Sequence, residues 1–473
     1  MATIHAAVLH ERRIHAGEWR AVALSFVYFF CVLAAYYILR PVREQLFSAV
    51  GGSTRQTWFY ATVFAATLCL TPLFGALATR FPRRIVIPVV YTFFIVCLFG
   101  FIPFFTYEGL IKPYVLGVVF FVWVSVFNLF VVAVFWSFMV DIWDEDQAKR
   151  LFPLIALGGP AGAIVGPALT QIFVGRIGVA SLLIVSAALL TLAMTCAVLL
   201  GRWSRVYGAR RFEVGHESAV GGSMWDGLKQ VFSNPFVRGM SILLLLGDGI
   251  GTVNYALVAD YARDAFTDAI ARTRFFAGMD MTTNILQVLL QLFLTRALLP
   301  RWGAGPLITI WGLGVMVVLL VVGLASDPHA AVSGMSAAQI SQTTAGIAGD
   351  GWFAELARSM TVFILIMPWV ALALVITRAL AYGLVGPARE SLFSLVPRSL
   401  RYKGKNAVDT AVWRFGDLSV AMVMDSLRLF GVGVAGFSLL AATSGAVASL
   451  VGWRLSARAR TDYAVPGYQV GGA

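Results

Sequence analysis

Long runs of apolar residues alternate with short polar clusters along the whole chain. Runs of about 20 apolar residues have the length of a helix that crosses the hydrocarbon core of a bilayer. The first run is too long for the apolar region of a signal peptide and continues into a charged segment, so we expect it to remain as a span. The pattern predicts twelve spans, over residues 20–47, 57–79, 85–107, 114–141, 151–174, 178–201, 238–262, 275–299, 304–325, 359–394, 406–429 and 432–454.

The composition supports a membrane protein. Of the 473 residues, 59% are hydrophobic and only 13% are charged, and the mean hydropathy is +0.81. A soluble domain of this size needs more charge, because its surface must stay solvated. The sequence therefore predicts an all-α membrane protein.

The basic residues predict the orientation of the spans. A net charge of +12 would suggest nucleic-acid binding in a soluble protein, but here the charges lie in short clusters between apolar runs. With both termini in the cytoplasm, most of the 36 Lys and Arg residues fall in cytoplasmic loops, as the positive-inside rule requires. We expect a multi-pass protein of the bacterial inner membrane with cytoplasmic termini and no nucleic-acid partner.

A basic segment near the midpoint divides the chain into two halves of six spans. The predicted parts are an N-terminal six-helix bundle, a cytoplasmic linker, a C-terminal six-helix bundle and a cytoplasmic tail, over residues 1–201, 202–237, 238–455 and 456–473. The segment Ser326–Arg358 is rich in Ala, Gly and Ser and is expected to be an external, flexible loop.

Three short motifs concern the packing of the helices. Gly158, Gly162 and Gly166 are four residues apart, which puts a flat stripe on one helix and lets backbones pack closely. The loop GALATRFPRR (Gly75–Arg84) resembles a loop pattern of major-facilitator transporters, with Thr79 and Pro82 as departures. LTRALLPRWG (Leu294–Gly303) occupies the equivalent place in the second half. The recurrence favours a duplicated, major-facilitator-type fold.

One motif occurs twice. YYILRPVREQLF (36–47) and YGLVGPARESLF (382–393) share Pro-x-Arg-Glu-x-Leu-Phe, which aligns Pro41 with Pro387, Arg43 with Arg389 and Glu44 with Glu390. In the predicted topology the first copy lies near the outer face and the second near the inner face. Inverted three-helix repeats within each six-helix half would produce this arrangement.

Charged residues inside the predicted spans are the candidate functional groups. A charge in hydrocarbon is costly, so such residues usually face a cavity and a partner. The candidate binding residues are arginines, which suit phosphate or carboxylate groups because their planar fork binds in two-point fashion: Arg40, Arg43, Arg378, Arg389 and Arg414. The candidate gating or coupling acids are Glu44, Asp248, Asp280, Glu390, Asp409 and Asp417. Each Asp–Arg couple could equally be a structural ion pair; Arg414 and Asp417, three residues apart, could pair within one helix.

Three segments resemble the bacterial and plastid ATP:ADP antiporter family and its relatives in free-living bacteria. They are LRPVRE (39–44), FWSFMVDIWDEDQAKRLFPLIALGGPAGAIVGP (135–167) and RYKGKNAVDT (401–410). The resemblance implies nucleotide exchange, with phosphates contacted by basic residues of these segments: Arg40, Arg43, Lys149, Arg150, Lys403 and Lys405.

The chain departs from this family at two places. The nucleotide carriers have an acidic residue within helix four, whereas no acidic residue occurs here between Glu108 and Asp141. They also have a Gly-Lys-Ser-Gly-Gly stretch where this chain has RFGDLSVAM (414–422). The resemblance therefore implies fold and transport more strongly than ATP or ADP as substrate.

Three classes of function stay open at this point. The leading hypothesis is a monomeric secondary carrier without a cofactor, which moves a small organic anion such as a nucleotide or another phosphorylated metabolite. The second is a proton-coupled exporter of drugs or metabolites that uses Asp248, Asp280 or Asp409. The third is a membrane-embedded enzyme or a non-transporting sensor.

Several residue types argue against the enzyme. All five histidines lie outside the predicted spans, so they offer no catalytic constellation. The four cysteines have no CxxC spacing, so neither a metal site nor a disulfide framework is expected. The chain has no GxxxxGK[ST] loop either, which excludes an ATP-driven pump encoded in this chain.

Overall fold

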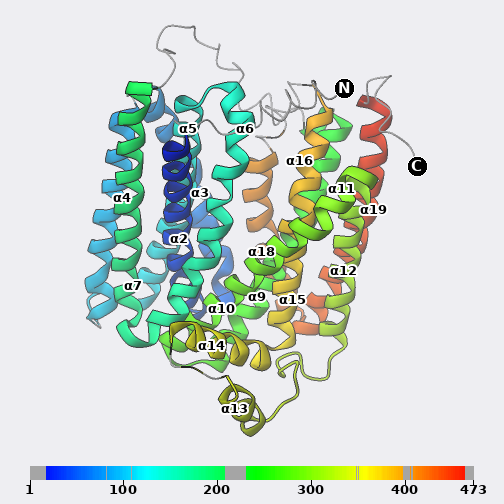
Figure 1. The fold of residues 1–473 in the computed structure, drawn as a ribbon. Helices are drawn as coiled ribbons and strands as arrows, with labels where there is room; N and C mark the ends of the chain where they lie inside the picture. Colours follow the sequence, from blue (N-terminus) through cyan, green and yellow to red (C-terminus); the bar gives the residue numbers. More distant parts are fainter. Residues whose placement is uncertain are drawn as a thin grey trace. The chain divides into compact units, whose positions relative to one another are not determined.

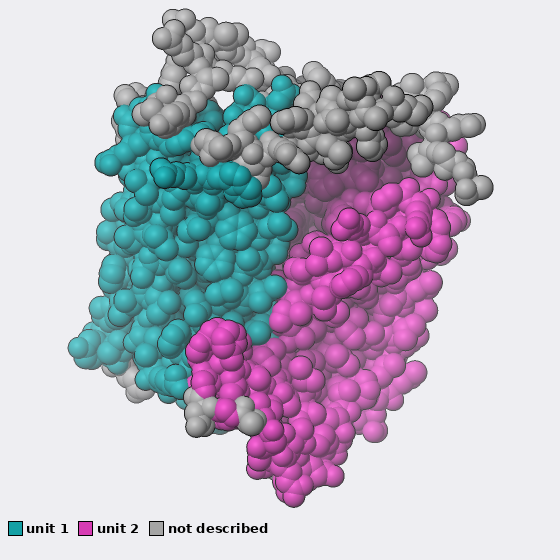
Figure 2. Space-filling model, in the orientation of Figure 1, with its two compact units in different colours: residues 1–50, 65–215, 267–281 teal, residues 51–64, 216–266, 282–473 magenta. Residues whose placement is uncertain are grey.

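A computed structural model of the chain describes residues 18–80, 83–107, 109–207, 231–347, 349, 351–397, 405 and 408–463. Every regular element in these ranges is a helix, as Figure 1 shows. The prediction of an all-α fold is confirmed. The helices form two compact units, which Figure 2 colours separately.

The two units do not follow the predicted halves along their whole length. Unit 1 comprises Met1–Val50, Ala65–Gly215 and Thr267–Met281, and unit 2 comprises Gly51–Phe64, His216–Phe266 and Thr282–Ala473. Each unit thus contains one short segment from the other half of the sequence. The linker and tail predictions fall mostly outside the described residues, although the helix that precedes the tail continues to Tyr463.

Unit 1 is built around its first helix, α2. Its helices are α2 (Trp19–Ala49), the second part of α3 (Gln56–Arg80), α4 (Arg83–Thr106), α5 (Pro113–Ile142), α6 (Glu145–Ala156), α7 (Gly158–Tyr207) and the beginning of α10 (Ala269–Leu289). α2 packs against α5, α6 and, most extensively, α7. Large apolar side chains such as Tyr28, Phe127 and Phe135 are fully buried in the core that results.

The glycine stripe brings α7 against the backbone of α2. A Cβ atom on Gly158 would lie 2.5 Å from the carbonyl oxygen of Phe26, and one on Gly166 would lie 2.7 Å from that of Ala34. Gly162 approaches the backbone of α2 between these two points. The predicted close packing along this stripe is confirmed. Further along α7, Gly178 has φ 75° and interrupts the helix where the predicted fifth and sixth spans meet.

The described part of unit 2 contains the remaining helices, one 3-10 turn and three π-helical turns. They are the 3-10 turn η1 (Gly52–Arg55), the first part of α3, α9 (Pro235–Ala265), the second part of α10, η2 (Leu290–Thr295), α11 (Arg296–Trp302), α12 (Ala304–Leu324), α13 (Ala337–Ala345), α14 (Trp352–Ile366), α15 (Trp369–Leu380), η3 (Ala381–Val385), α16 (Gly386–Leu395), η5 (Val408–Val412), α18 (Trp413–Leu429) and α19 (Val434–Tyr463). α9 packs against α15, α18 and α19, and α12 lies along α19.

Nine stretches of the described chain are helical, long and apolar enough to cross a membrane: Trp19–Ala49, Val86–Thr106, Pro113–Ile142, Arg150–Arg205, Pro235–Ala265, Ala269–Trp302, Ala304–Leu324, Trp369–Leu395 and Val434–Asp462. The chain is therefore a multi-pass membrane protein. The stretch Arg150–Arg205 contains the break at Gly178. Two predicted spans are not among these nine stretches. The span 57–79 corresponds to α3, whose side chains are described only to Leu70. The span 406–429 corresponds to α18, which has 17 residues.

The structure places the beginning of span ten differently from the sequence prediction. Residues 359–366 belong to the separate helix α14, and the apolar helix begins at Trp369, after Pro368. A proline at the start of a helix needs no backbone N–H partner, so it favours a new helix there. The preceding segment, expected to be a flexible loop, contains α13, whose first turn is held by a capping box between Ser336 and Gln339.

Candidate functional site

In unit 1, the predicted binding and gating residues of α2 form one buried ionic cluster. Arg40 Nη1 lies 3.0 Å from Asp280 Oδ1 on α10, and Arg40 Nε lies 3.7 Å from Glu44 Oε1 one turn along α2. The three residues are 9%, 4% and 3% exposed, respectively. Two carboxylates around one guanidinium offset part of the cost of burying charge among apolar helices.

Arg43 extends this cluster toward α5. Its Nη2 lies 2.5 Å from Glu44 Oε1, and its Nη1 donates a hydrogen bond of 3.4 Å to Ser125 Oγ. The guanidinium lies 4.8 Å from the centre of the Phe121 ring, a cation–π contact. Groups of both α2 and α5 therefore contact Arg43 and fix the orientation of its guanidinium.

In unit 2, α9 presents one polar face to α15 and α18. Asp248, Thr252 and Tyr255 are spaced four and three residues apart, so they lie on the same face of the helix. Thr252 Oγ1 donates a hydrogen bond of 3.4 Å to Asp417 Oδ1. Arg414 Nη1 lies 3.5 Å from Asp417 Oδ2, as the three-residue spacing predicts.

Asp248 reaches α18 through a gap left by a glycine. A Cβ atom on Gly416 would lie 2.8 Å from Asp248 Oδ2, so the carboxylate rests against the backbone next to Asp417. The Oδ2 atom is buried and has no hydrogen-bond partner among the described residues. Two carboxylates and one arginine, Arg414, thus meet where α9 and α18 cross, which leaves this cluster with more acid than base.

Arg378 differs from the other predicted arginines. It lies within the apolar helix α15, and its guanidinium is 5.7 Å from the centre of the Tyr255 ring. Within the described part of the chain, no carboxylate lies within ion-pair distance of Arg378, whereas Arg40, Arg43, Arg389 and Arg414 all have one. The residues that directly precede Tyr255 and Arg378 are also in contact: Asn254 Nδ2 donates a hydrogen bond of 3.3 Å to Thr377 Oγ1.

The second copy of the repeated motif lies in a more exposed setting than the first. Arg389 Nη1 is 2.9 Å from Asp409 Oδ1, and Lys405 Nζ is 2.6 Å from Glu390 Oε2. The Glu390 side chain is 53% exposed, whereas that of Glu44 is 3% exposed. Asp409 lies in the π-helical turn η5, and its partner is thus Arg389 of the repeated motif.

Some predicted residues lie beyond what the structure describes. Lys403 is outside the described residues, and so are the side chains of the loop Gly75–Arg84 and of Lys149. Arg150, matched to phosphate contacts by the resemblance, donates a hydrogen bond of 2.9 Å to Glu18 Oε1 at the beginning of α2. Lys405 contacts Glu390 and lies 5.9 Å from the centre of the Phe393 ring.

The neutral polar partners of these charges were not among the residues predicted from the sequence. Ser125, Thr252, Tyr255 and Thr377 each contact a charged or polar residue of the clusters. Thr252 and Tyr255 follow Asp248 at helical spacing, a signal that was present in the sequence. No comparable signal marks Ser125, because its role depends on the packing of α5 against α2.

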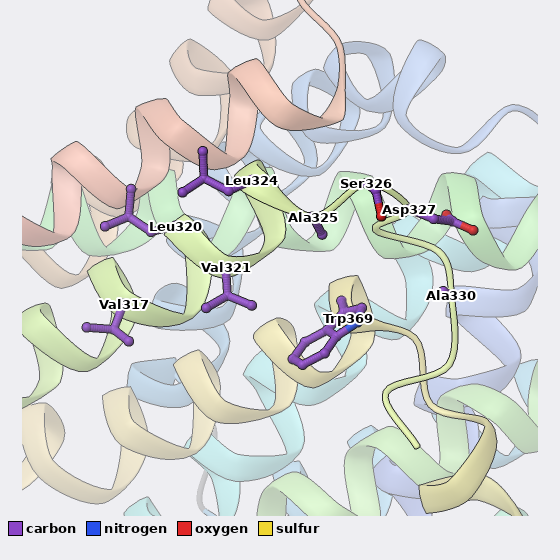
Figure 3. A pocket seen from close by; sticks show the side chains of 9 residues that line it. All are labelled: Val317, Leu320, Val321, Leu324, Ala325, Ser326, Asp327, Ala330 and Trp369. Atoms are coloured by element: carbon purple, nitrogen blue, oxygen red, sulfur yellow. The ribbon is translucent and has the colours of Figure 1, made fainter. Parts of the chain in front are cut away.

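A hollow lies in unit 2, away from these clusters, and Figure 3 displays it. It has a volume of about 590 Å³ and is lined by the end of α12, the chain after it and Trp369, the residues being Val317, Leu320, Val321, Leu324, Ala325, Ser326, Asp327, Ala330 and Trp369. None of the predicted site residues lines it. In the described ranges, no group of three or more His, Cys, Asp or Glu residues comes together that could hold a metal ion.

Solved structures of transporters resemble this chain over nearly its full length. The nucleoside transporter NupG is 13% identical, with a TM-score of 0.60, over 93% of this chain and 99% of that one. PepTSo, a POT family transporter, is 13% identical with a TM-score of 0.58, over 94% and 99% of the two chains. The xylose transporter XylE from E. coli is 14% identical with a TM-score of 0.53, over 93% and 98%.

The chain has the fold of these transporters. At such identities the likeness shows the fold alone, which is of the major-facilitator type expected from the sequence. No family model and no curated protein matches the chain. The narrower resemblance to the ATP:ADP antiporter family stays an expectation.

Proposed function

We propose that this protein is a secondary active transporter that moves a small organic anion across the bacterial inner membrane by alternating access. Twelve spans in two six-helix halves with inverted three-helix repeats, cytoplasmic termini and a monomeric state belong to the same proposal. The fold shared with transporters of nucleosides, peptides and xylose supports it. The candidate substrates are nucleotides and other phosphorylated metabolites, exchanged across the membrane.

The anionic character of the substrate rests on Arg378. A guanidinium within an apolar span requires a compensating charge, and the described residues of unit 2 supply only the ring of Tyr255. A phosphate or carboxylate group of a substrate would provide that charge with two-point hydrogen bonds. The buried Asn254 and Thr377 hydrogen-bond each other beside this arginine, so they add no charge that could compensate it.

The test is uptake of labelled nucleotide into proteoliposomes, with and without nucleotide inside. Counter-exchange is expected for at least one nucleoside di- or triphosphate. Arg378→Gln should raise the KM by roughly 10- to 100-fold, the range for losing a hydrogen bond to a charged group. Arg378→Lys keeps the charge but loses the planar guanidinium, so its KM should lie between those of the wild type and of Arg378→Gln.

The matched control is Arg301→Gln, because Arg301 is an exposed arginine at the end of α11. This variant should transport like the wild type. Absence of exchange for every nucleotide tested would remove nucleotides as substrates. An unchanged KM in Arg378→Gln for whichever anion is transported would remove the assignment of Arg378.

Proton coupling is a second candidate function, favoured by one observation. Asp248 and Asp417 bring two carboxylates to the crossing of α9 and α18 beside a single arginine, Arg414. Neighbouring carboxylates hold a proton more readily than isolated ones, because like charges disfavour double ionisation. A proton carrier would show uptake driven by an imposed pH gradient, and Asp248→Asn would abolish it while preserving substrate exchange. Exchange that ignores the pH gradient would exclude this candidate.

A further inference from the structure

Two helices pass from one compact unit to the other. α3 begins in unit 2, which includes Gly51–Phe64, and continues in unit 1 from Ala65. α10 begins in unit 1, which includes Thr267–Met281, and continues in unit 2 from Thr282. The first segment begins before the predicted second span, 57–79, and includes the first residues of that span, so it lies at the outer ends of the spans in the proposed topology. The contacts that hold this segment in unit 2 therefore lie at the outer membrane face.

Asp260, near the end of α9, binds the first residues of this segment. It accepts hydrogen bonds from both the backbone N–H of Ser53, at 3.0 Å, and the Ser53 hydroxyl. Gly52 has φ 54°, and a Cβ atom there would lie 2.7 Å from Asp260 Oδ1. A glycine is therefore required for the carboxylate to come this close. Arg263, one turn after Asp260, donates a hydrogen bond of 3.2 Å to the carbonyl oxygen of Gly51.

The end of α18 binds the same segment from its other side. Arg428 Nη1 donates a hydrogen bond of 2.9 Å to the carbonyl oxygen of Ser53. Asp425 accepts one of 2.6 Å from Thr57 Oγ1. Arg428 lies 3.3 Å from Asp425 and 3.9 Å from Asp260, so it links the two carboxylates. Two acids and two arginines thus surround one short piece of chain.

The charges of this group are balanced and partly solvated. Ser53 is 1% exposed, but the Asp260 and Arg428 side chains are 26% and 23% exposed. Water can therefore replace the lost contacts when the group separates. Fully buried ion pairs would make separation far more costly, and fully exposed ion pairs would stabilise the closed arrangement only weakly. The group is suited to reversible opening.

We propose that Asp260, Arg263, Asp425 and Arg428 form a latch that holds residues 51–57 at the outer ends of α9 and α18, and that the latch must open before the substrate site can face outward. This inference rests on the proposed function, because alternating access requires a reversible closure on each side. The latch explains why a segment of the first half of the sequence belongs to unit 2.

The test measures the distance between spin labels on Thr54→Cys and Leu429→Cys, two exposed positions on either side of the latch. The background is a full-length protein in which the four native cysteines are replaced by alanine, in lipid nanodiscs. The otherwise unchanged protein should give one short distance. Asp260→Asn with Arg428→Gln should add a longer-distance population, with the open-to-closed ratio raised roughly tenfold by the loss of charge-assisted hydrogen bonds.

The matched control is Asp264→Asn: Asp264 lies on α9 beside the latch, and among the described residues it pairs with Arg263 and with none of residues 51–57. It should leave the distance distribution unchanged. Asp425→Asn removes the contact with Thr57 but preserves Asp260, so it should raise the open-to-closed ratio by less than the double variant does. This single variant replaces the double variant in the test if the latter does not fold. Distributions that are the same in all four proteins overturn the latch. The measurement needs no substrate, so a failure to find transport contradicts the proposed function without changing this result.

Discussion

At the scale of single residues, each arginine in the apolar helices has a different neighbourhood. Arg40 is enclosed by two carboxylates, Asp280 and Glu44, whereas Arg378 faces a tyrosine ring. The sequence identified these arginines because any charge in a long apolar run is conspicuous. It did not reveal that Asp280, 240 positions after Arg40 in the sequence, would supply the counter-charge. That pairing depends on how α10 packs against α2.

We expect Asp280→Asn to destabilise the protein by about 3 kcal/mol, because it leaves a buried arginine without its nearest counter-charge. Replacing both partners, as in Arg40→Met with Asp280→Leu, should recover most of that loss, since the pair is then exchanged for apolar packing. Thermal unfolding in detergent measures both effects. If the double variant is also transport-competent, the pair is purely structural; we expect it to be stable and inactive.

At the scale of elements, the helices were predictable and several of their ends were not. Hydropathy locates a helix but says little about where it stops, since an apolar run can contain a break. Pro368 separates α14 from α15 within the single predicted span 359–394. The Ser and Gln of the α13 capping box have the spacing of a helix start in the sequence, but the surrounding Ala, Gly and Ser residues suggested a loop. The glycine stripe on α7 was the more reliable signal, because small residues at helical spacing have one direct packing consequence.

Gly162→Ala should lower the stability of the protein by about 2 kcal/mol, because the new methyl group would meet the backbone of α2 and force the helices apart. Gly201→Ala is the matched control on the same helix, since a Cβ atom there meets only the Phe138 ring at 4.0 Å. That variant should be as stable as the wild type, or slightly more stable because alanine favours helix. If both variants lost the same stability, the close packing of α7 on α2 would not be the reason for a glycine at position 162. Unfolding temperatures of the purified proteins provide the comparison.

At the scale of the whole molecule, loop charge predicts a topology that site-directed labelling can check. In a cysteine-free background, Ser341→Cys on α13 should react with a membrane-impermeant maleimide added to intact cells, because this segment is predicted to be external. Ser218→Cys, in the predicted central cytoplasmic segment, should react only after the membrane is permeabilised. The reverse result would invert the orientation, and with it the assignment of the latch to the outer face.

The sequence by itself determined that this is an all-helical membrane protein, where most helices lie, and which charges sit among apolar residues. These properties depend on composition and spacing along one helix, which the order of residues fixes directly. Only the tertiary structure decided which groups meet: Arg40 with Asp280, Arg389 with Asp409, and Ser53 with Asp260. Such pairings join segments far apart in the chain, and they arise from helix packing that local hydrophobic pattern does not specify.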